Sequence, residues 1–292
     1  MKHSASLVSI ILPNYNHAAF LQERLDSIFH QSHQNFEVII LDDASTDSSA
    51  SLLEPYRNHA KVSHFHINKV NTGSPFLQWK KGLLLARGKY IWIAESDDCC
   101  ELDFLEKQIQ QLDSCDVAVA RTKVFNTLEI GREITHPAFR AAACVKLSRE
   151  TLLFCPILNV STIVFKAVDQ QQLSNATFVQ YPIIGDLVFY YEFFFGSMLC
   201  QQLETTSYFR QEGTGLSNLD SKGLPYLAQY FNEHMKYIKY VKQHRGDEVT
   251  PMVKPYVHKF YRRVRDRLSK QDKLSFSYLK LYLYYQYLIR TI

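Results

Sequence analysis

Glycine, proline and cysteine are scarce or irregularly placed in this chain, and each shortage excludes a class of protein. Ten glycines and nine prolines among 292 residues exclude a collagen-like or low-complexity chain. The hydrophobic fraction of 46% excludes a disordered one. The six cysteines form no CxxC pair and follow no regular spacing, so we expect reduced thiols in a cytosolic protein.

Secretory signals and long apolar runs are missing as well. The first apolar run, at residues 7–12, is too short for the core of a signal peptide and ends at Pro13. No uninterrupted apolar stretch reaches about 18 residues, so a membrane-spanning helix is not expected. The sequence therefore favours a cytoplasmic location, including the inner face of the cell membrane.

Charge is unevenly distributed along the chain. The whole sequence carries a formal charge of +4, from 33 Lys and Arg against 29 Asp and Glu. Residues 254–292 hold ten of the basic residues and two of the acidic ones, a charge of +8. The first 253 residues are therefore acidic, at −4. Because no nucleic-acid-binding module is recognisable either, we expect no nucleic-acid partner.

Strand and helix patterns alternate through the N-terminal half. Apolar runs indicate buried strands at residues 7–12, 36–41, 62–67, 89–95 and 116–120. Segments with the helical spacing of apolar residues lie between them. This alternation predicts an α/β fold with a mostly parallel sheet flanked by helices. Ligands of such sheets bind beyond the carboxyl ends of the strands.

Acidic residues follow two of these strands: Asp42, Asp43 and Asp47 after the second, and Glu95, Asp97 and Asp98 after the fourth. Mg²⁺ and Mn²⁺ bind carboxylate oxygens together with substrate phosphates, so the strand ends indicate a metal–nucleotide site. The alternative is that Asp42, Asp43 and Asp47 only cap the short helix that follows, which Ser45 or Asp47 would open. Capping does not explain two adjacent carboxylates at residues 97 and 98.

Glycine-rich phosphate loops are absent. The first strand–helix turn, at residues 13–17, contains no glycine, which disfavours a GxGxxG dinucleotide site. No GxxxxGK[ST] motif occurs, so P-loop nucleotide hydrolases are excluded. The missing glycine-rich turn also weakens the alternative of a metal-dependent nucleotidyltransferase. What remains is a sheet enzyme that holds a nucleotide through carboxylates and a metal.

Two segments together resemble the inverting glycosyltransferases of family 2, which have the GT-A fold. Residues 8–49 resemble the opening of that family, and residues 71–98 resemble the segment that ends in its DxD-type metal motif, here ESDD. The resemblance extends over roughly residues 7–217. It implies transfer of a sugar from a nucleotide-sugar donor, most often UDP-linked, to a saccharide or lipid-linked saccharide acceptor, with Mn²⁺ or Mg²⁺ as cofactor.

The resemblance also implies roles for individual residues in donor binding. Pro13 and Tyr15 would line the base pocket, and Asp43 would accept a hydrogen bond from the uracil N–H. Asp97 would contact the ribose or the sugar. Asp98 would hold the metal on the diphosphate.

Other positions depart in part from the family's pattern. Glu95 stands where a strict DxD motif has its first aspartate, and is a second candidate metal ligand. Arg210 matches an arginine that would hold a phosphate. Glu212 stands where histidine is frequent, and Gln78 occupies the region of a usual arginine. These last two departures support the alternative of a non-catalytic, membrane-associated subunit with the same fold.

The segment at residues 181–195 resembles the acceptor side of the family, where an acidic residue opens an aromatic helix. Asp186 would then be the general base that takes the proton of the acceptor hydroxyl. The structural alternative for Asp186 is a helix N-cap after Gly185. Glu192 is another candidate base, but it lies in the middle of the helix among aromatic residues.

We expect two parts: a catalytic domain over residues 1–221 and a helical C-terminal appendage over residues 222–292. The basic, aromatic end of the chain has two interpretations. It packs on the catalytic domain as a solvated helix, or it lies on a membrane with Lys and Arg at anionic headgroups and Tyr and Leu at the interface.

Overall fold

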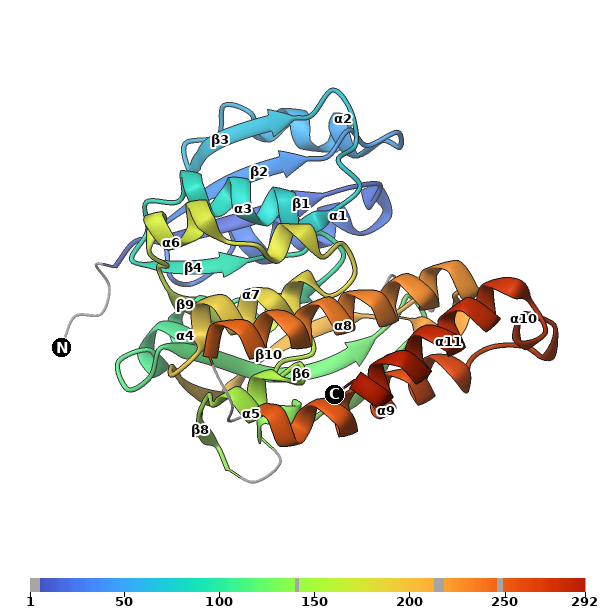
Figure 1. The fold of residues 1–292 in the computed structure, drawn as a ribbon. Coiled ribbons are helices and arrows are strands. Elements are labelled where there is room, and N and C mark those ends of the chain that lie inside the picture. Colours follow the sequence, from blue (N-terminus) through green and yellow to red (C-terminus); the bar gives the residue numbers. More distant parts are fainter. Residues whose placement is uncertain (1–5, 140–141, 213–217, 246–248, 292) are drawn as a thin grey trace.

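The computed structural model describes residues 6–139, 142–212, 218–245 and 249–291, which form one central sheet with helices on both faces (Figure 1). The strand order is β3-β2-β1-β4-β9-β6-β10-β5, with β7 paired to β6 and β8 paired to β10. The expected α/β class with flanking helices and a helical C-terminal region is confirmed.

The first half of the sheet is parallel. Its strands are β1 (Val8–Asn14), β2 (Phe36–Asp42), β3 (Val62–Ile67) and β4 (Tyr90–Ile93), and they pair in parallel as β1–β2, β1–β4 and β2–β3. Every residue of β1 and β2 is buried, which explains their continuous apolar sequences. Their carboxyl ends therefore lie at one edge of the sheet.

The second half makes the sheet mixed. Strand β9 (Ile163–Lys166) runs antiparallel between β4 and β6 (Val117–Phe125), so β6 runs parallel to β4. Strand β10 (Met198–Arg210) pairs in parallel with β6. The short strands β5 (Cys99–Cys100), β7 (Ile130–Ile134) and β8 (Cys144–Lys146) add antiparallel pairings. The carboxyl ends of β6 and β10 thus lie at the same edge as those of β1, β2 and β4.

Two layers of helices cover the sheet. Alternate residues of β1 point to opposite faces: Ile10 packs with α1 (Ala18–Phe29) and α4 (Phe104–Gln111), and Ile11 with α3 (Pro75–Leu85) and α7 (Gly185–Phe194). The remaining short helices are α2 (Ser49–Leu53), α5 (Arg149–Leu152), α6 (Gln170–Asn175) and α10 (Lys270–Lys273), with 3₁₀ turns at Glu54–Tyr56, Pro137–Phe139, Val160–Thr162, Phe178–Gln180 and Leu219–Ser221.

The C-terminal region consists of α8 (Leu224–Arg245), α9 (Thr250–Arg265) and α11 (Phe276–Thr291). Helices α8 and α9 contribute residues to the same hydrophobic cluster as α3 and α7. Helix α8 packs on α7, and α9 packs on α8 and on Phe154 (Figure 1). The hydroxyl of Tyr237 on α8 also donates to the buried carbonyl of Leu152. Among the described residues, no helix combines the length and apolar character needed to cross a membrane.

One disulfide corrects the expectation of six reduced thiols. Cys144 on β8 and Cys200 on β10 are bonded to each other, and they face one another directly in the antiparallel register. Spacing could not reveal the pair, because 56 residues separate the two cysteines and only the strand pairing brings them together. The other four cysteines are free.

We predict that Gly82→Ala destabilises the protein. A Cβ at Gly82 of α3 would lie 2.3 Å from Cγ2 of Ile11 in the core, and overpacking of this kind costs about 1–3 kcal/mol. Urea denaturation should show a lower free energy of unfolding, even though alanine favours helices. The matched control is Gly223→Ala, whose Cβ would meet only Pro225, at 3.8 Å. Equal stability of the two variants would contradict the packing argument.

Candidate functional site

The loops that follow β1 and β2 are joined to each other at the carboxyl edge of the sheet. Asn14 Nδ2 donates to Asp42 Oδ2 at 2.6 Å, and the backbone N–H of Asn16 donates to Ser45 Oγ at 2.9 Å. Asn16 and Ala44 have φ values of 56° and 62°, a left-handed conformation that alanine rarely adopts. Strained backbone of this kind persists where surrounding contacts hold it, often at functional sites.

The acidic residues after β2 have separate roles in the fold. Asp47 accepts hydrogen bonds from the first backbone N–H groups of two helices, those of Ala18 and Ser49, at 2.9 Å each. Asp47 therefore does supply a capping acceptor, as the alternative predicted. The N-cap position of α2 is nevertheless Ser48, not Ser45 or Asp47.

Asp43 is buried and its orientation is held by three partners. Its Oδ1 accepts from Asn68 Nδ2 at 2.6 Å and from Gln78 Nε2 at 2.9 Å, and its Oδ2 accepts from Thr72 Oγ1 at 2.7 Å. Gln78, a departure from the family's pattern, thus acts as a support for Asp43. Of the two residues expected at the base pocket, Pro13 is buried within β1, while the side chain of Tyr15 is 43% exposed.

The three acidic residues after β4 form a cluster that is largely enclosed by protein. Trp79 Nε1 donates to Glu95 Oε1 at 2.6 Å. Asp98 Oδ1 accepts from the backbone N–H of Arg210, and its Oδ2 accepts from Asn159 Nδ2, both at 2.9 Å. Each carboxylate oxygen of Asp98 therefore has one protein donor and keeps one lone pair for a further ligand.

Burial and mutual repulsion favour the protonated form of these carboxyl groups. Burial, followed by the charge of Asp97, raises the pKa of Glu95 to about 8. The same two causes raise the pKa of Asp98 to about 6. Burial also raises the pKa of Asp97. Such perturbed groups at the ligand edge of a sheet are typical of functional sites, because a cation or hydrogen-bond donor of the ligand restores the charged form.

Arg24 supplies the first positive charge near the cluster. It lies on the buried side of α1 with its guanidinium 4.6 Å from the centre of the Trp92 ring. Within the described part of the chain, its guanidinium nitrogens have no oxygen acceptor. Its charge nevertheless lowers the pKa of all three carboxyl groups against the larger effect of burial. Arg24 was not among the site residues predicted from the sequence.

Arg210 supplies the second positive charge. Its guanidinium lies between the rings of Phe20 and Phe125, at 4.3 and 4.1 Å from their centres. It donates to the carbonyl oxygen of Asp97 at 2.8 Å and also to the carboxylates of Glu23 and Glu212. A phosphate bound by Arg210 would therefore compete with these carboxylates for its N–H groups.

Asp186 opens α7, as the aromatic segment predicts. Helix α7 precedes β10, whose carboxyl end is at the acidic edge, so the start of α7 faces that edge. Burial raises the pKa of Asp186 to about 6, and the charge of Glu233 adds to this effect. Asp186 is not the N-cap, a position that Ile184 occupies, although its Oδ1 accepts the N–H of Leu187 at 2.8 Å.

A row of aromatic residues joins Asp186 to the acidic cluster. Gly185 packs so closely on Phe76 that a Cβ there would lie 2.4 Å from the ring. Phe76 in turn contacts Trp79 with their ring centres 5.0 Å apart, and Trp79 holds Glu95. The charges of both Asp186 and Glu95 contribute, after burial, to the raised pKa of Tyr190. The fold therefore brings together two acidic groups that lie about 90 residues apart in the sequence.

Two other candidate residues have contacts that restrict their roles. Glu192, the alternative base, accepts hydrogen bonds from the backbone N–H of Thr177 at 2.8 Å and from the hydroxyl of Tyr240 at 3.1 Å. These contacts indicate a structural role for Glu192. Glu212 accepts from the backbone N–H of Thr127 at 2.8 Å as well as from Arg210, so it neutralises Arg210.

The described residues contain no preformed metal centre. Within the described ranges, no three His, Cys, Asp or Glu side chains lie close enough together to hold a metal ion. The donor set nevertheless fits Mg²⁺ or Mn²⁺, because such ions bind through one or two carboxylates when a substrate phosphate supplies further oxygens.

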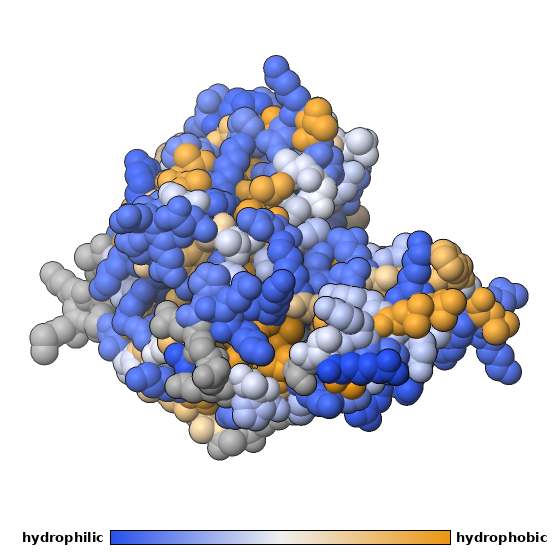
Figure 2. All heavy atoms as spheres, in the orientation of Figure 1, coloured by the Kyte–Doolittle hydropathy of each residue, from blue (hydrophilic) through white to orange (hydrophobic). Residues whose placement is uncertain are grey.

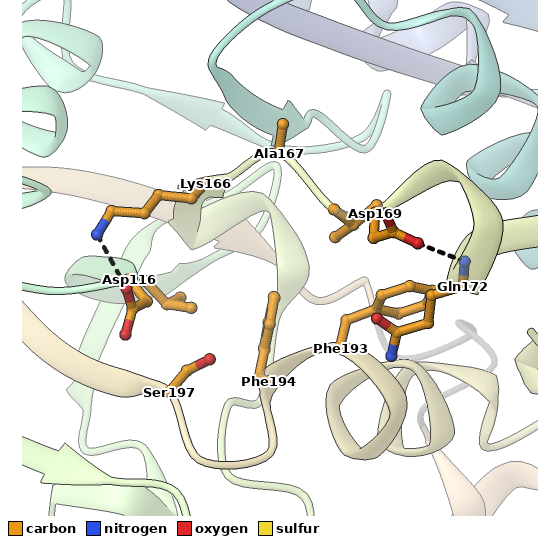
Figure 3. A pocket seen from close by; sticks show the side chains of 10 residues that line it. Asp116, Lys166, Ala167, Asp169, Gln172, Phe193, Phe194 and Ser197 are labelled. Carbon is orange, nitrogen blue, oxygen red and sulfur yellow. Dashed lines mark hydrogen bonds and ion pairs between the residues drawn. The ribbon is translucent and has the colours of Figure 1, made fainter.

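A cavity of about 200 Å³ lies at the opposite edge of the sheet (Figure 3). Its lining includes Asp116, which precedes β6, and Lys166, which ends β9; the two form an ion pair at 2.9 Å. Phe193 and Phe194 of α7 close another side. The cavity is therefore distinct from the acidic edge, and its lining includes none of the candidate site residues.

Comparison with known proteins agrees with this arrangement. Residues 9–153 match the model of glycosyl transferase family 2. The putative teichuronic acid biosynthesis glycosyltransferase TuaG of Bacillus subtilis is 36% identical over 104 residues, 36% of this chain and 41% of TuaG. Glycosyltransferase GlyG of Streptococcus pneumoniae is 31% identical over 125 residues, 42% of this chain and 40% of GlyG. The matches thus span about two fifths of the length of these relatives.

Solved structures share the fold at low sequence identity. Staphylococcus aureus TarS 1–349 in complex with UDP has a TM-score of 0.58 and 17% identity, covering 97% of this chain and 90% of TarS 1–349. The mannosyltransferase PcManGT of Pyrobaculum calidifontis, in complex with GDP-Man and Mn²⁺, has a TM-score of 0.53 and 17% identity over 97% and 72% of the two chains. The family-model match, these relatives and this common fold lead to one conclusion. Residues 9–153 of this chain form a glycosyl transferase family 2 domain.

Proposed function

We propose that this protein transfers a sugar, with inversion, from a UDP-sugar to the hydroxyl group of a saccharide acceptor. The observation that carries this proposal is the largely enclosed carboxylate cluster at the carboxyl edge of the sheet, joined through Trp79 to the helix that carries Asp186 in its first turn. One side of this arrangement suits a nucleoside diphosphate with its metal, and the other suits a nucleophile that must lose a proton.

The donor side uses residues of three strand ends. Tyr15 stacks on the base beside Pro13, Asp43 accepts the N–H of uracil, and Asp97 binds the ribose or sugar. Support for UDP comes from relatives of the fold: TarS has been solved in complex with UDP and with UDP-GlcNAc. Arg210 balances the charge of the acidic cluster and approaches the diphosphate if Glu23 or Glu212 releases it.

Mn²⁺ or Mg²⁺ is the proposed cofactor, held by Asp98 with Glu95 as the second candidate. The free lone pairs of Asp98 and the absence of a third protein ligand among the described residues support a metal that enters together with the diphosphate. A divalent ion supplies charge neutralisation for the departing nucleoside diphosphate. Asp98 orients it, since Asn159 and the Arg210 N–H fix the carboxylate.

Asp186 is the proposed general base. The acceptor oxygen attacks the anomeric carbon as the bond to the diphosphate breaks, and the hydroxyl proton passes to the Asp186 carboxylate. A pKa of about 6 suits this step, because the group is ionised at neutral pH and still basic enough to accept a proton. The attack from the side opposite the leaving group inverts the configuration.

We predict different losses for Asp186→Asn and Asp98→Asn. Asp186→Asn should keep metal-dependent UDP affinity and lose about 10²- to 10⁴-fold in transfer, the usual contribution of a general base. Asp98→Asn should lose metal-dependent UDP binding itself. Binding is measured by calorimetry with UDP, and transfer by UDP release from a panel of UDP-sugars supplied with saccharide acceptors.

Glu192→Gln is the matched control for the base, since Glu192 lies on the same helix and binds Thr177 and Tyr240 instead of facing the acidic edge. Transfer at the wild-type rate by Asp186→Asn would refute the role of Asp186. A UDP affinity unchanged in Asp98→Asn would refute the metal assignment.

We also propose that α11 lies on an anionic membrane, where a lipid-linked acceptor would be found. Phe276, Leu279, Leu283 and Tyr287 are between 48% and 70% exposed, and at 100° per residue they form one stripe of the helix. Lys280 belongs to the same stripe, with its ammonium 4.7 Å from the centre of the Phe276 ring. In Figure 2 apolar atoms gather on the projecting end of the C-terminal helices, next to strongly hydrophilic ones.

Apolar and basic groups on one face are the combination that an anionic lipid surface binds. The double variant Leu283→Ser, Tyr287→Ser should therefore lose most of its co-sedimentation with vesicles containing phosphatidylglycerol. Leu128→Ser, at a 93% exposed position in the β6–β7 turn, is the control and should bind like the wild type. Equal co-sedimentation of all three proteins, or equal binding to neutral phosphatidylcholine vesicles, would contradict this role of α11.

A further inference from the structure

Glu233 lies on α8 in the C-terminal region and is 7% exposed. Its Oε2 accepts hydrogen bonds from the backbone N–H groups of Ile183 and Ile184, at 2.9 and 3.1 Å. Its Oε1 accepts from Gln229 Nε2 at 3.0 Å. Both oxygens are thus used, and two of the three donors belong to the segment that leads directly into Asp186.

The start of α7 needs such an acceptor from elsewhere in the chain. Its N-cap residue is Ile184, whose side chain cannot accept a hydrogen bond. Backbone N–H groups at the start of a helix have no partner within the helix, and an unpaired buried N–H costs about 1–3 kcal/mol. Glu233, which lies 49 residues after Ile184 in the sequence, supplies this acceptor. Its negative charge is also favourable beside the positive end of the helix dipole.

Several other groups surround Asp186. Cys155, from the segment after α5, approaches Asp186 Oδ2 with its sulfur at 3.9 Å. After burial, the charge of the Asp186 carboxylate contributes to the raised pKa of three tyrosines: Tyr190 of α7, and Tyr226 and Tyr230 of α8. The positive charge of Arg263 on α9 lowers the pKa of Cys155 and of Tyr230, against the larger effect of burial. Of the groups that act on Asp186 itself, Glu233 is the one that adds a second negative charge.

We propose that Glu233 is a positioning residue for the Asp186 carboxylate, which it holds in place through the N–H groups of Ile183 and Ile184. This inference rests on the proposed function, in which Asp186 is the general base. It makes α8 part of the catalytic unit, since one of its side chains fixes the segment that carries the base. The same carboxylate keeps Asp186 a stronger base than burial alone would.

Two substitutions separate the hydrogen bonds of Glu233 from its charge. Glu233→Gln keeps one oxygen that accepts both N–H groups and removes the negative charge. Asp186 then ionises more easily, so the acid limb of kcat/KM, which rises with pH as the base loses its proton, should move to lower pH. At pH values above this limb, kcat should be close to that of the wild type.

Glu233→Ala removes the acceptor as well as the charge. The segment at residues 183–186 is then free to shift, and displacement of a catalytic group by about 1 Å costs up to roughly 10²-fold in rate. We expect kcat to fall about tenfold or more, while UDP affinity in the presence of Mn²⁺ stays at the wild-type value. A kcat near the wild-type value in Glu233→Gln, beside a reduced kcat in Glu233→Ala, would show that the hydrogen-bond acceptor positions Asp186.

Tyr240→Phe is the matched control, because it removes another hydrogen bond between α8 and α7, that from Tyr240 to Glu192, without touching residues 183–186. It should leave the pH profile and kcat unchanged. The inference is overturned if Glu233→Gln has the pH profile of the wild type, or if Tyr240→Phe reproduces the loss seen with Glu233→Ala. Asp186→Asn, assayed in parallel, reports on the proposed function alone: if it transfers normally, the base assignment fails whatever the Glu233 variants do.

Discussion

Three carboxyl groups after β4 lie close together, Asp98 fully buried and Glu95 and Asp97 partly buried, and the site depends on how their charge is balanced. Burial raises the pKa of each group, and Asp97 adds repulsion to both neighbours. The guanidinium of Arg24 lowers the pKa of all three groups, and that of Arg210 lowers the pKa of Asp97. Among the described residues, neither guanidinium forms an ion pair with these three carboxylates. The carboxyl groups therefore lose their protons most readily when a cation lies beside them, which a divalent ion bound with a diphosphate would provide.

The rest of the edge is arranged around this cluster. Asn159 and the backbone of β10 orient Asp98, Trp79 orients Glu95, and the loops after β1 and β2 are fastened to each other by side chains such as Asn14. Trp79 also packs against α7, with its ring centre 5.8 Å from that of Phe189. An aromatic layer therefore connects the acidic cluster with α7, the helix that carries Asp186. Helix α8 packs on α7 and hydrogen-bonds the segment that precedes it.

Local sequence patterns were enough to predict the parallel strands and the acidic strand ends. The continuous apolar sequence of β1, for example, is what burial on both faces requires. Contacts between distant segments could not be predicted in this way: Cys144 meets Cys200 through strand pairing, and Glu233 meets Ile183 through helix packing. Arg24 is an intermediate case, because an arginine between Leu21 and Leu25 on an apolar helix face signals an unusual environment, while its neighbour Trp92 lies 68 residues away.

The central claim is that the acidic edge binds a nucleoside diphosphate through a divalent ion that the protein does not hold by itself. Calorimetric titration of UDP into the wild-type protein, first with Mn²⁺ and then with EDTA, tests this claim most directly. The account predicts micromolar binding with Mn²⁺ and none with EDTA. UDP binding of equal affinity in EDTA, or no binding of UDP in the presence of Mn²⁺, would contradict it.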